Sequence, residues 1–410
     1  MKFLFLVLSM TEIVFAQSRF SIPHLDLEMT GVEYQNFFRG SLDDEFDSEL
    51  EPVMRMGKKY LDWLKKVNEN RPEGMKLSLS SPENQPGYPI ESPRVSSPKL
   101  ILESLSQLKS QLPEELKSTV LGSTQINHIL PVSDEVFIFW GRQIDELYAR
   151  ASRWLLQEPY LWAYADRKHD DVRGYYYLSR VLEVEEKLLQ WKNLSQETQT
   201  QYQTWLEGLC FNGGGSSSEC REEFQETIQK IGHPKDFYLK YLPKGQVKWA
   251  GLFNITQKRD DIIWKGEDLK TLKTPFTQPE SEEVKTFLSE NIEDEWKWKD
   301  WRLNLNFISG GFDTTHIEFV PGATPHVNGL AGSTITMDAN QPLTEYHVRW
   351  TIRHEFGHTL GFPDCYVEFY DTDKAVMISY QLDTTNLMCS RRGKLQEKHY
   401  EELKRVYYTP

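Results

Sequence analysis

The chain has few basic residues for its length. Its 410 residues include 47 Lys and Arg against 61 Asp and Glu, which gives a formal charge of -14. A surface of this sign repels phosphate backbones and anionic lipid headgroups, so we expect no nucleic-acid partner. After residue 16 the sequence also lacks any apolar stretch long enough to span a bilayer. We therefore expect no membrane span.

Cysteine is scarce as well, with four in the whole chain. An even number of cysteines is typical of exported proteins whose thiols are oxidised in pairs. An export signal stands at the N-terminus, where Lys2 precedes the apolar run 3–8 and Ala16 offers a small residue before Gln17. We expect residues 1–16 to be a secretory signal peptide, and the protein to be secreted or periplasmic. The alternative is a buried N-terminal element.

Residues 17–243 form the first of two regions with different sequence patterns, and we expect this one to be mostly helical. Apolar residues at helical spacing predict helices over 48–70, 133–159, 171–191, 195–209 and 220–231. Six prolines between residues 71 and 98 favour a surface linker there. Cys210 and Cys220 flank a loop rich in Gly and Ser, which favours a disulfide between them over two free thiols.

The second region, residues 244–410, mixes strand and helix patterns. Strands are predicted over 247–255, 302–308, 316–320 and 333–338, and helices over 279–298 and 394–406. The predicted fold class is therefore α+β, with a mostly helical N-terminal region followed by a domain of ordinary size.

The chemistry of the chain is concentrated in the motif HExxHxxGxxD at residues 354–364. Thr344 can cap a helix, and apolar residues at helical spacing follow it, so the motif is expected on a helix. His354 and His358 then stand on one face, about 6 Å apart at Cβ, and can bind one zinc ion. Glu355 can take a proton from a zinc-activated water and pass it to the leaving amine. A structural pair of helix histidines is the alternative.

The third zinc ligand has to come from beyond the helix. In a continued helix, Asp364 would be rotated about 240° from His358, away from the metal. Gly361 can adopt the left-handed conformation that ends a helix, and Pro363 cannot extend one, so the chain can turn back toward the metal. Three protein ligands leave a fourth position for water, as in catalytic zinc sites. A solvated turn residue is the alternative role for Asp364.

On these residues the chain resembles the metzincin zinc endopeptidases, and its third ligand is most similar to that of the snapalysin type. Metzincins carry a methionine turn, the Met-turn, below the metal, and residues 386–390 look like it. The resemblance implies that Met388 packs under the ligands without binding zinc, and that a rim strand near 322–332 aligns the substrate. Ser390 stands where some metzincins have a tyrosine, so a tyrosine switch is not implied. An ordinary core methionine is the alternative for Met388.

The same resemblance brings two more cysteines together. Cys365 directly follows the third ligand and Cys389 directly follows the Met-turn methionine. A fold with both elements under one metal implies a disulfide between these residues, which would hold Asp364 in place. A cysteine thiolate on the zinc is the alternative.

Together these features predict a secreted zinc endopeptidase that hydrolyses a protein or peptide substrate lying along an edge strand. One alternative is an aspzincin-like metalloprotease with Asp371 or Asp373 as the third ligand. Another is a non-catalytic zinc-containing binding protein with a helical interaction domain. The intact Glu355 favours an enzyme, since a binding protein would not need it.

The helical region has no chemistry of its own, and a propeptide is one interpretation of it. Metzincin zymogens commonly fill the open zinc position from an N-terminal segment, so the resemblance implies a ligand before residue 244. Residues 38–43 are similar to the aspartate-switch segment of astacin propeptides, and Cys210 is a cysteine-switch candidate unless it is bonded to Cys220. A permanent helical domain that binds substrate or a cell-surface partner is the alternative.

Overall fold

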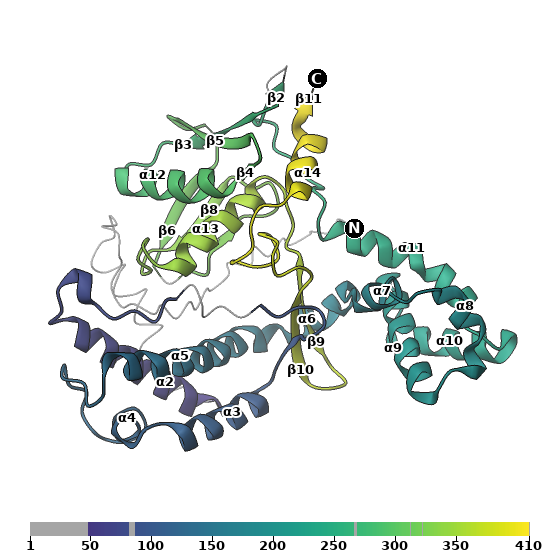
Figure 1. The fold of residues 1–410 in the computed structure, drawn as a ribbon, viewed down its shortest axis with the longest axis horizontal. Coiled ribbons are helices and arrows are strands. Elements are labelled where there is room, and N and C mark those ends of the chain that lie inside the picture. The colour runs from purple at the N-terminus through teal and green to yellow at the C-terminus, as the bar shows by residue number, and fades with distance from the viewer. Residues whose placement is uncertain (1–47, 82–86, 266–268, 312, 322, 410) are drawn as a thin grey trace, which may run out of the picture.

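The computed structural model describes residues 48–81, 87–265, 269–311, 313–321 and 323–409. The expected signal peptide 1–16 and the switch candidate 38–43 lie outside these residues. The chain is a mixed α+β structure in which helices predominate and the sheets are small. Figure 1 shows three lobes, which we name the N-terminal lobe (48–157), the middle lobe (158–251) and the C-terminal lobe (252–409).

The N-terminal lobe is a group of amphipathic helices. They are α2 (Glu51–Asn68), α3 (Pro98–Gln111), α4 (Glu114–Val120) and α5 (Asp134–Gln157). Ser97 and Ser133 begin α3 and α5 by accepting a hydrogen bond from the backbone N–H three residues later. Tyr60 of α2 stacks on Phe137 of α5 with 4.7 Å between ring centroids. The helices predicted over 48–70 and 133–159 are confirmed.

The middle lobe is helical throughout. Its α-helices are α6 (Leu161–Asp166), α7 (Arg173–Leu178), α8 (Val184–Leu189), α9 (Gln196–Asn212), α10 (Ser217–Ile231) and α11 (Lys235–Gly251). The single helix predicted over 171–191 is wrong, because a turn that ends at the left-handed Glu183 separates α7 from α8. A disulfide joins Cys210 to Cys220 and ties α9 to α10, which confirms the predicted pair.

The boundary expected at residues 243 and 244 falls inside helix α11. The strand predicted over 247–255 is also wrong, since residues 247–251 complete this helix. Packing against α7 and α9 within the middle lobe explains the difference. Gly245 has no side chain, and a Cβ there would lie 2.4 Å from Leu209 of α9, so the two helices approach closely. Trp249 then packs on Tyr175 of α7 at 5.7 Å between ring centroids.

The C-terminal lobe contains two small sheets and the helix with the motif. One sheet has the order β3 (Thr271–Thr277), β5 (Trp301–Ile308), β4 (Lys297–Trp298), and the other has the order β6 (His316–Val320), β8 (Thr334–Asp338), β7 (His326–Val327). The helices are α12 (Glu282–Leu288), α13 (Tyr346–Thr359) and α14 (Glu397–Tyr407), and β2 (Trp264–Lys265) pairs with β11 (Tyr408–Thr409). The strands predicted over 302–308, 316–320 and 333–338 and the C-terminal helix are confirmed. The helix predicted over 279–298 is shorter: α12 continues through a π-helical turn (Ser289–Glu293) to residue 295, and residues 297 and 298 form β4 instead.

The proline-rich segment is more than a surface linker. Its strand β1 (Arg94–Ser96) pairs with β10 (Val376–Gln381), which forms a hairpin with β9 (Tyr366–Asp371). Ile90, in the same segment, is only 1% exposed. Pro93 and Pro98 flank β1 without disturbing the ladder, since β1 is an edge strand and its outer side needs no backbone donors.

The β9–β10 hairpin joins the lobes, as Figure 1 shows at the centre of the molecule. One of its faces contributes Met377 to the buried core of the N-terminal lobe, and Tyr370 contacts Trp154 of α5. Its other face contributes Phe369 and Tyr380 to the core of the C-terminal lobe. The helical region and the C-terminal region therefore share buried side chains.

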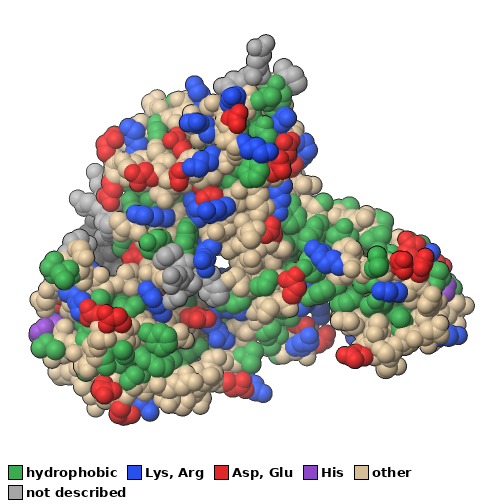
Figure 2. Space-filling model, in the orientation of Figure 1, with side chains coloured by type: hydrophobic (Ala, Val, Ile, Leu, Met, Phe, Trp, Pro, Cys, Tyr) green, Lys and Arg blue, Asp and Glu red, His purple; other side chains and the backbone are tan. Residues whose placement is uncertain are grey.

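Charges of both signs are distributed over the visible surface (Figure 2). Lys and Arg side chains alternate with Asp and Glu, while hydrophobic side chains gather on the N-terminal lobe. None of the helices in the described ranges has the length and apolar composition needed to cross a bilayer.

Candidate metal centre

The motif lies on helix α13, as the sequence predicts. The N-cap residue is Glu345 rather than Thr344, and no side-chain cap bond is formed. Instead, Ser80 of the proline-rich segment accepts a hydrogen bond from the backbone N–H of Tyr346 at 3.2 Å. Buried Ile352 and Phe356 hold the helix against the core of the C-terminal lobe.

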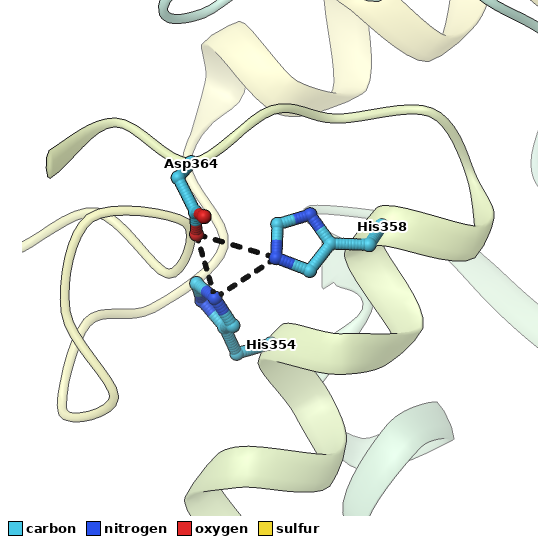
Figure 3. Close-up of side chains that lie close together, drawn as sticks. All are labelled: His354, His358 and Asp364. Atoms are coloured by element: carbon cyan, nitrogen blue, oxygen red, sulfur yellow. Dashed lines mark hydrogen bonds and ion pairs between the residues drawn. The ribbon is translucent and has the colours of Figure 1, made fainter. Parts of the chain in front are cut away.

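Three potential ligand atoms converge at the end of α13 (Figure 3). The Nε2 atoms of His354 and His358 are 3.1 Å apart. The Oδ1 atom of Asp364 lies 3.1 Å from the first and 3.2 Å from the second. A tetrahedral zinc ion with bonds near 2.05 Å separates its ligand atoms by about 3.3 Å, so the triangle fits this ion closely. Within the described ranges, no further His, Cys, Asp or Glu joins this group.

The outer nitrogen of each imidazole is held by a backbone carbonyl. Nδ1 of His354 lies 3.0 Å from the carbonyl oxygen of Leu387, and Nδ1 of His358 lies 2.8 Å from that of Phe362. A carbonyl can only accept, so each Nδ1 carries the hydrogen and each Nε2 presents a lone pair to the centre. This is the arrangement by which proteins orient histidine ligands toward a metal.

Gly361 turns the chain so that Asp364 can return to the site. Its φ is +90°, the left-handed region predicted for it. A Cβ at this position would also lie 2.1 Å from the backbone oxygen of Gln257. The backbone N–H groups of Gly361 and Phe362 donate to the carbonyls of His358 and Gly357 and close the last turn of the helix.

The predicted Met-turn lies directly against α13. A Cβ added to Gly357 would lie 2.3 Å from the sulfur of Met388, so the thioether packs directly on the helix at Gly357. Cys365 is bonded to Cys389, which confirms the second predicted disulfide. The backbone N–H of Cys365 also donates to the carbonyl of Met388 at 3.2 Å. The turn that carries Asp364 is thereby fixed to the Met-turn by two links.

Asn386 and His399 stabilise the Met-turn by hydrogen bonds. The side-chain oxygen of Asn386 accepts from the backbone N–H of Met388 at 2.8 Å and from Nε2 of His399 at 2.8 Å. Nδ1 of His399 accepts from the backbone N–H of Gln396 at 2.9 Å. Both nitrogens are therefore satisfied in the neutral imidazole, and the carbonyl oxygen of Gln396, 3.3 Å from Nδ1, is the acceptor available to a second proton. Burial, and secondarily Lys398, lower the pKa of His399 to about 4.

The lowered pKa of His399 predicts that the fold loses stability in acid. The unfolded chain binds this proton near pH 6.5, whereas the folded chain binds it only near pH 4. The stabilising contribution of neutral His399 is therefore complete above pH 6.5 and disappears as the pH falls toward 4. The loss amounts to about 3 kcal/mol of unfolding free energy. Urea unfolding of wild type and His399→Gln between pH 7.5 and pH 4 measures it. The variant should show a smaller decline, and parallel curves would contradict the prediction.

The charges of the centre favour a cation. Burial raises the pKa of Asp364, yet the hydrogen bonds from His354 and His358 outweigh it and hold this pKa well below its usual range. Burial opposes the charge on His358, yet the contact with Asp364 raises its pKa to about 9. A proton on His358 offsets the negative charge of Asp364, and a divalent ion would compete with that proton for the Nε2 lone pair of His358.

Two further residues lie at the centre. Glu355, the predicted general base, is only 6% exposed, and its carboxylate makes no hydrogen bond or ion pair with any described residue. Tyr366, which the sequence analysis missed, stacks on His354 with 6.5 Å between ring centroids. Burial and the nearby Asp364 raise its pKa well above the usual range. Its position two residues after a ligand is the signal that could have identified it, because side chains i and i+2 of an extended chain lie on the same side.

The alternative ligands do not reach the centre. Asp371 accepts hydrogen bonds from the backbone N–H groups of Asp373 and Lys374, and it lies 3.8 Å from Lys168 of the middle lobe. Asp373 lies 3.5 Å from the same lysine. Cys210 is bonded to Cys220, so the cysteine-switch interpretation is wrong.

The predicted rim lies beside the centre. Strand β7 is the antiparallel edge of its sheet, and the backbone N–H of Ala331 donates to the carbonyl of His358 at 2.8 Å. This bond connects the loop after β7 to the last turn of α13.

Comparisons with protein-family models, with curated proteins and with solved structures find no match for this chain. The resemblance to metzincins therefore rests on the motif residues of the sequence.

Proposed function

We propose that the protein is a secreted zinc endopeptidase that hydrolyses internal peptide bonds. One observation carries the proposal: two imidazole nitrogens and a carboxylate form a triangle of 3.1–3.2 Å, and Glu355, which is 6% exposed and has no hydrogen bond or ion pair among the described residues, is close enough to act electrostatically on His358. A structural zinc site would use four protein ligands, whereas three leave room for water. A charged residue without a partner is costly to bury unless a ligand or water uses it.

His354, His358 and Asp364 would hold the ion. Zinc in such a site lowers the pKa of a water molecule and polarises the scissile carbonyl. Glu355 accepts the proton of the attacking water and delivers it to the amide nitrogen as the C–N bond breaks. Tyr366, whose raised pKa keeps it protonated at neutral pH, can donate a hydrogen bond at the centre.

The substrate would lie along the rim. Strand β7 is a sheet edge next to α13, and an extended peptide can add to such an edge by main-chain hydrogen bonds. The helical region would stay with the mature enzyme rather than leave as a propeptide. Its support is the shared packing: removal of residues 48–243 would take away β1 and expose Met377 and Tyr370 of the hairpin next to Asp364.

Removal of the metal tests the proposal. The full secreted chain, treated with a chelator and dialysed, should digest an unfolded protein at no more than about 1% of the rate of the zinc-loaded chain. One equivalent of zinc should restore the activity. Glu401→Gln, on the surface of α14, serves as a control that should behave like wild type. Cleavage that is indifferent to chelation, or a zinc-loaded chain without cleavage, would refute the assignment.

A further inference from the structure

A row of polar side chains leads away from the metal centre across the sheet of β9, β10 and β1. Glu368 of β9 pairs with Ser379 of β10, and Ser379 pairs with Arg94 of β1. Paired residues of neighbouring strands place their side chains on the same face. Glu368 also lies two residues after Tyr366 on β9, so the row shares the face on which Tyr366 contacts His354.

Helix α5 packs on the Glu368 end of this row. Arg153 makes a two-pronged ion pair with Glu368, with N–O distances of 3.1 and 2.7 Å. Glu368 is only 7% exposed in its side chain, and Arg153 neutralises its charge. The other positive charges of the row have no carboxylate in ion-pair contact among the described residues.

Those charges belong to Arg94 and Arg150. The guanidinium of Arg94 lies over the ring of Tyr88 at 5.2 Å, and one nitrogen of Arg150 lies 3.4 Å from the hydroxyl of Ser104. The Nε atom of Arg150 is buried and has no hydrogen-bond partner among the described residues. Neither guanidinium forms an ion pair with a carboxylate in the described ranges. Both are therefore held by neutral groups.

These guanidiniums also act on one another. Burial, and then the positive charges of Arg150 and Arg153, lower the pKa of Arg94, against the opposing effects of Tyr88 and Glu146. Half-buried like charges destabilise a fold unless an anion balances them. A carboxylate matches this need, because guanidinium groups bind it in a planar, two-pronged geometry. Nucleic-acid phosphate fits less well, since the chain carries a net charge of -14.

We propose that Arg94 and Arg150 form a subsite for an acidic side chain of the peptide substrate. The inference rests on the proposed function. Glu368, at the near end of the row, follows Asp364 by four residues, or about 13 Å of extended chain. Arg94 lies two strand spacings further across the sheet, about 10 Å, so the direct distance from Asp364 is about 16 Å, which an extended peptide covers with about five residues. The acidic residue would thus stand about four to six residues from the scissile bond, and the N-terminal lobe would set part of the specificity.

A scan of peptide substrates tests the subsite. In one peptide cleaved by the zinc-loaded full chain, each position in turn is changed from Gln to Glu. One position within the stated range should raise kcat/KM about tenfold, chiefly through KM, which corresponds to about 1.4 kcal/mol. Arg94→Gln and Arg150→Gln should each abolish the preference, and Arg94→Lys should retain part of it. Arg221→Gln, an exposed arginine of α10, is the matched control and should keep it.

Equal cleavage of all Glu and Gln peptides would overturn the subsite while leaving the protease assignment intact. Loss of the preference in Arg221→Gln would also overturn it, since the effect would then be general electrostatics. A second measurement does not depend on turnover. Binding of a labelled acidic peptide to Glu355→Gln, followed by fluorescence anisotropy, should weaken about tenfold when Arg94→Gln is added. Unchanged affinity would refute the subsite even if no cleavage were ever observed.

Discussion

Replacing Glu355 with glutamine should lower kcat for peptide hydrolysis by a factor of about 10² to 10⁴ without loss of zinc. Glutamine has the shape of glutamate, but its amide cannot take a proton from water or return one to the leaving amine. Since Glu355 makes no hydrogen bond or ion pair with described residues, the change should leave the fold intact. Steady-state kinetics together with zinc analysis by mass spectrometry measure both expectations.

A zinc-loaded Glu355→Gln chain that cleaves as fast as wild type would contradict the role of general base. Loss of zinc in this variant would indicate instead that Glu355 stabilises the metal site. Glu401→Gln on α14 controls for the removal of one negative charge.

Replacing Asp364 with asparagine should weaken zinc binding by more than about 100-fold, because loss of an outer partner of a ligand alone costs about 10- to 100-fold. The neutral amide no longer offsets the charge of the ion, and the two imidazoles remain as the only strong ligands. Competition with a fluorescent zinc chelator measures the affinity of the full chain.

Asp371→Asn is the matched control for this prediction. Asp371 is buried on the same hairpin, where it accepts the N–H groups of residues 373 and 374 instead of facing the histidines. The Asp371→Asn variant should keep zinc bound even if its fold becomes less stable. Zinc retained by Asp364→Asn and lost by Asp371→Asn would transfer the ligand role to the downstream aspartate.

The geometry of the centre was predictable because its determinants are local. The spacing of His354 and His358 fixes both on one helical face, and Gly361 has the φ of +90° that its place after the helix predicts. Cys365 and Cys389 are neighbours of the third ligand and of Met388, so their disulfide follows once those two residues meet. Each of these predictions depends on residues that are close together in the sequence.

The lobes were not predictable in the same way, because they depend on distant contacts. Residues 247–251 alternate like a strand, yet close packing of Gly245 on Leu209 keeps them helical. The segment around β1 has the composition of a linker. Its role as a strand depends on pairing with the distant β10. The cap of α13 shows the same limit, since Ser80 replaces Thr344 from 266 residues away.

The pairing of β1 with β10 also determines when the centre can form. Tyr88, just before β1, exchanges hydrogen bonds with Gln381, and the two residues are 293 positions apart. Loop closure over such a distance is slow, and domains generally fold in the order of their synthesis. The helices of the N-terminal lobe are therefore synthesised before the hairpin and can serve as the template onto which it docks, and Met377 then completes their core. During synthesis the candidate metal centre can therefore form only after the hairpin and residues 386–399 have emerged.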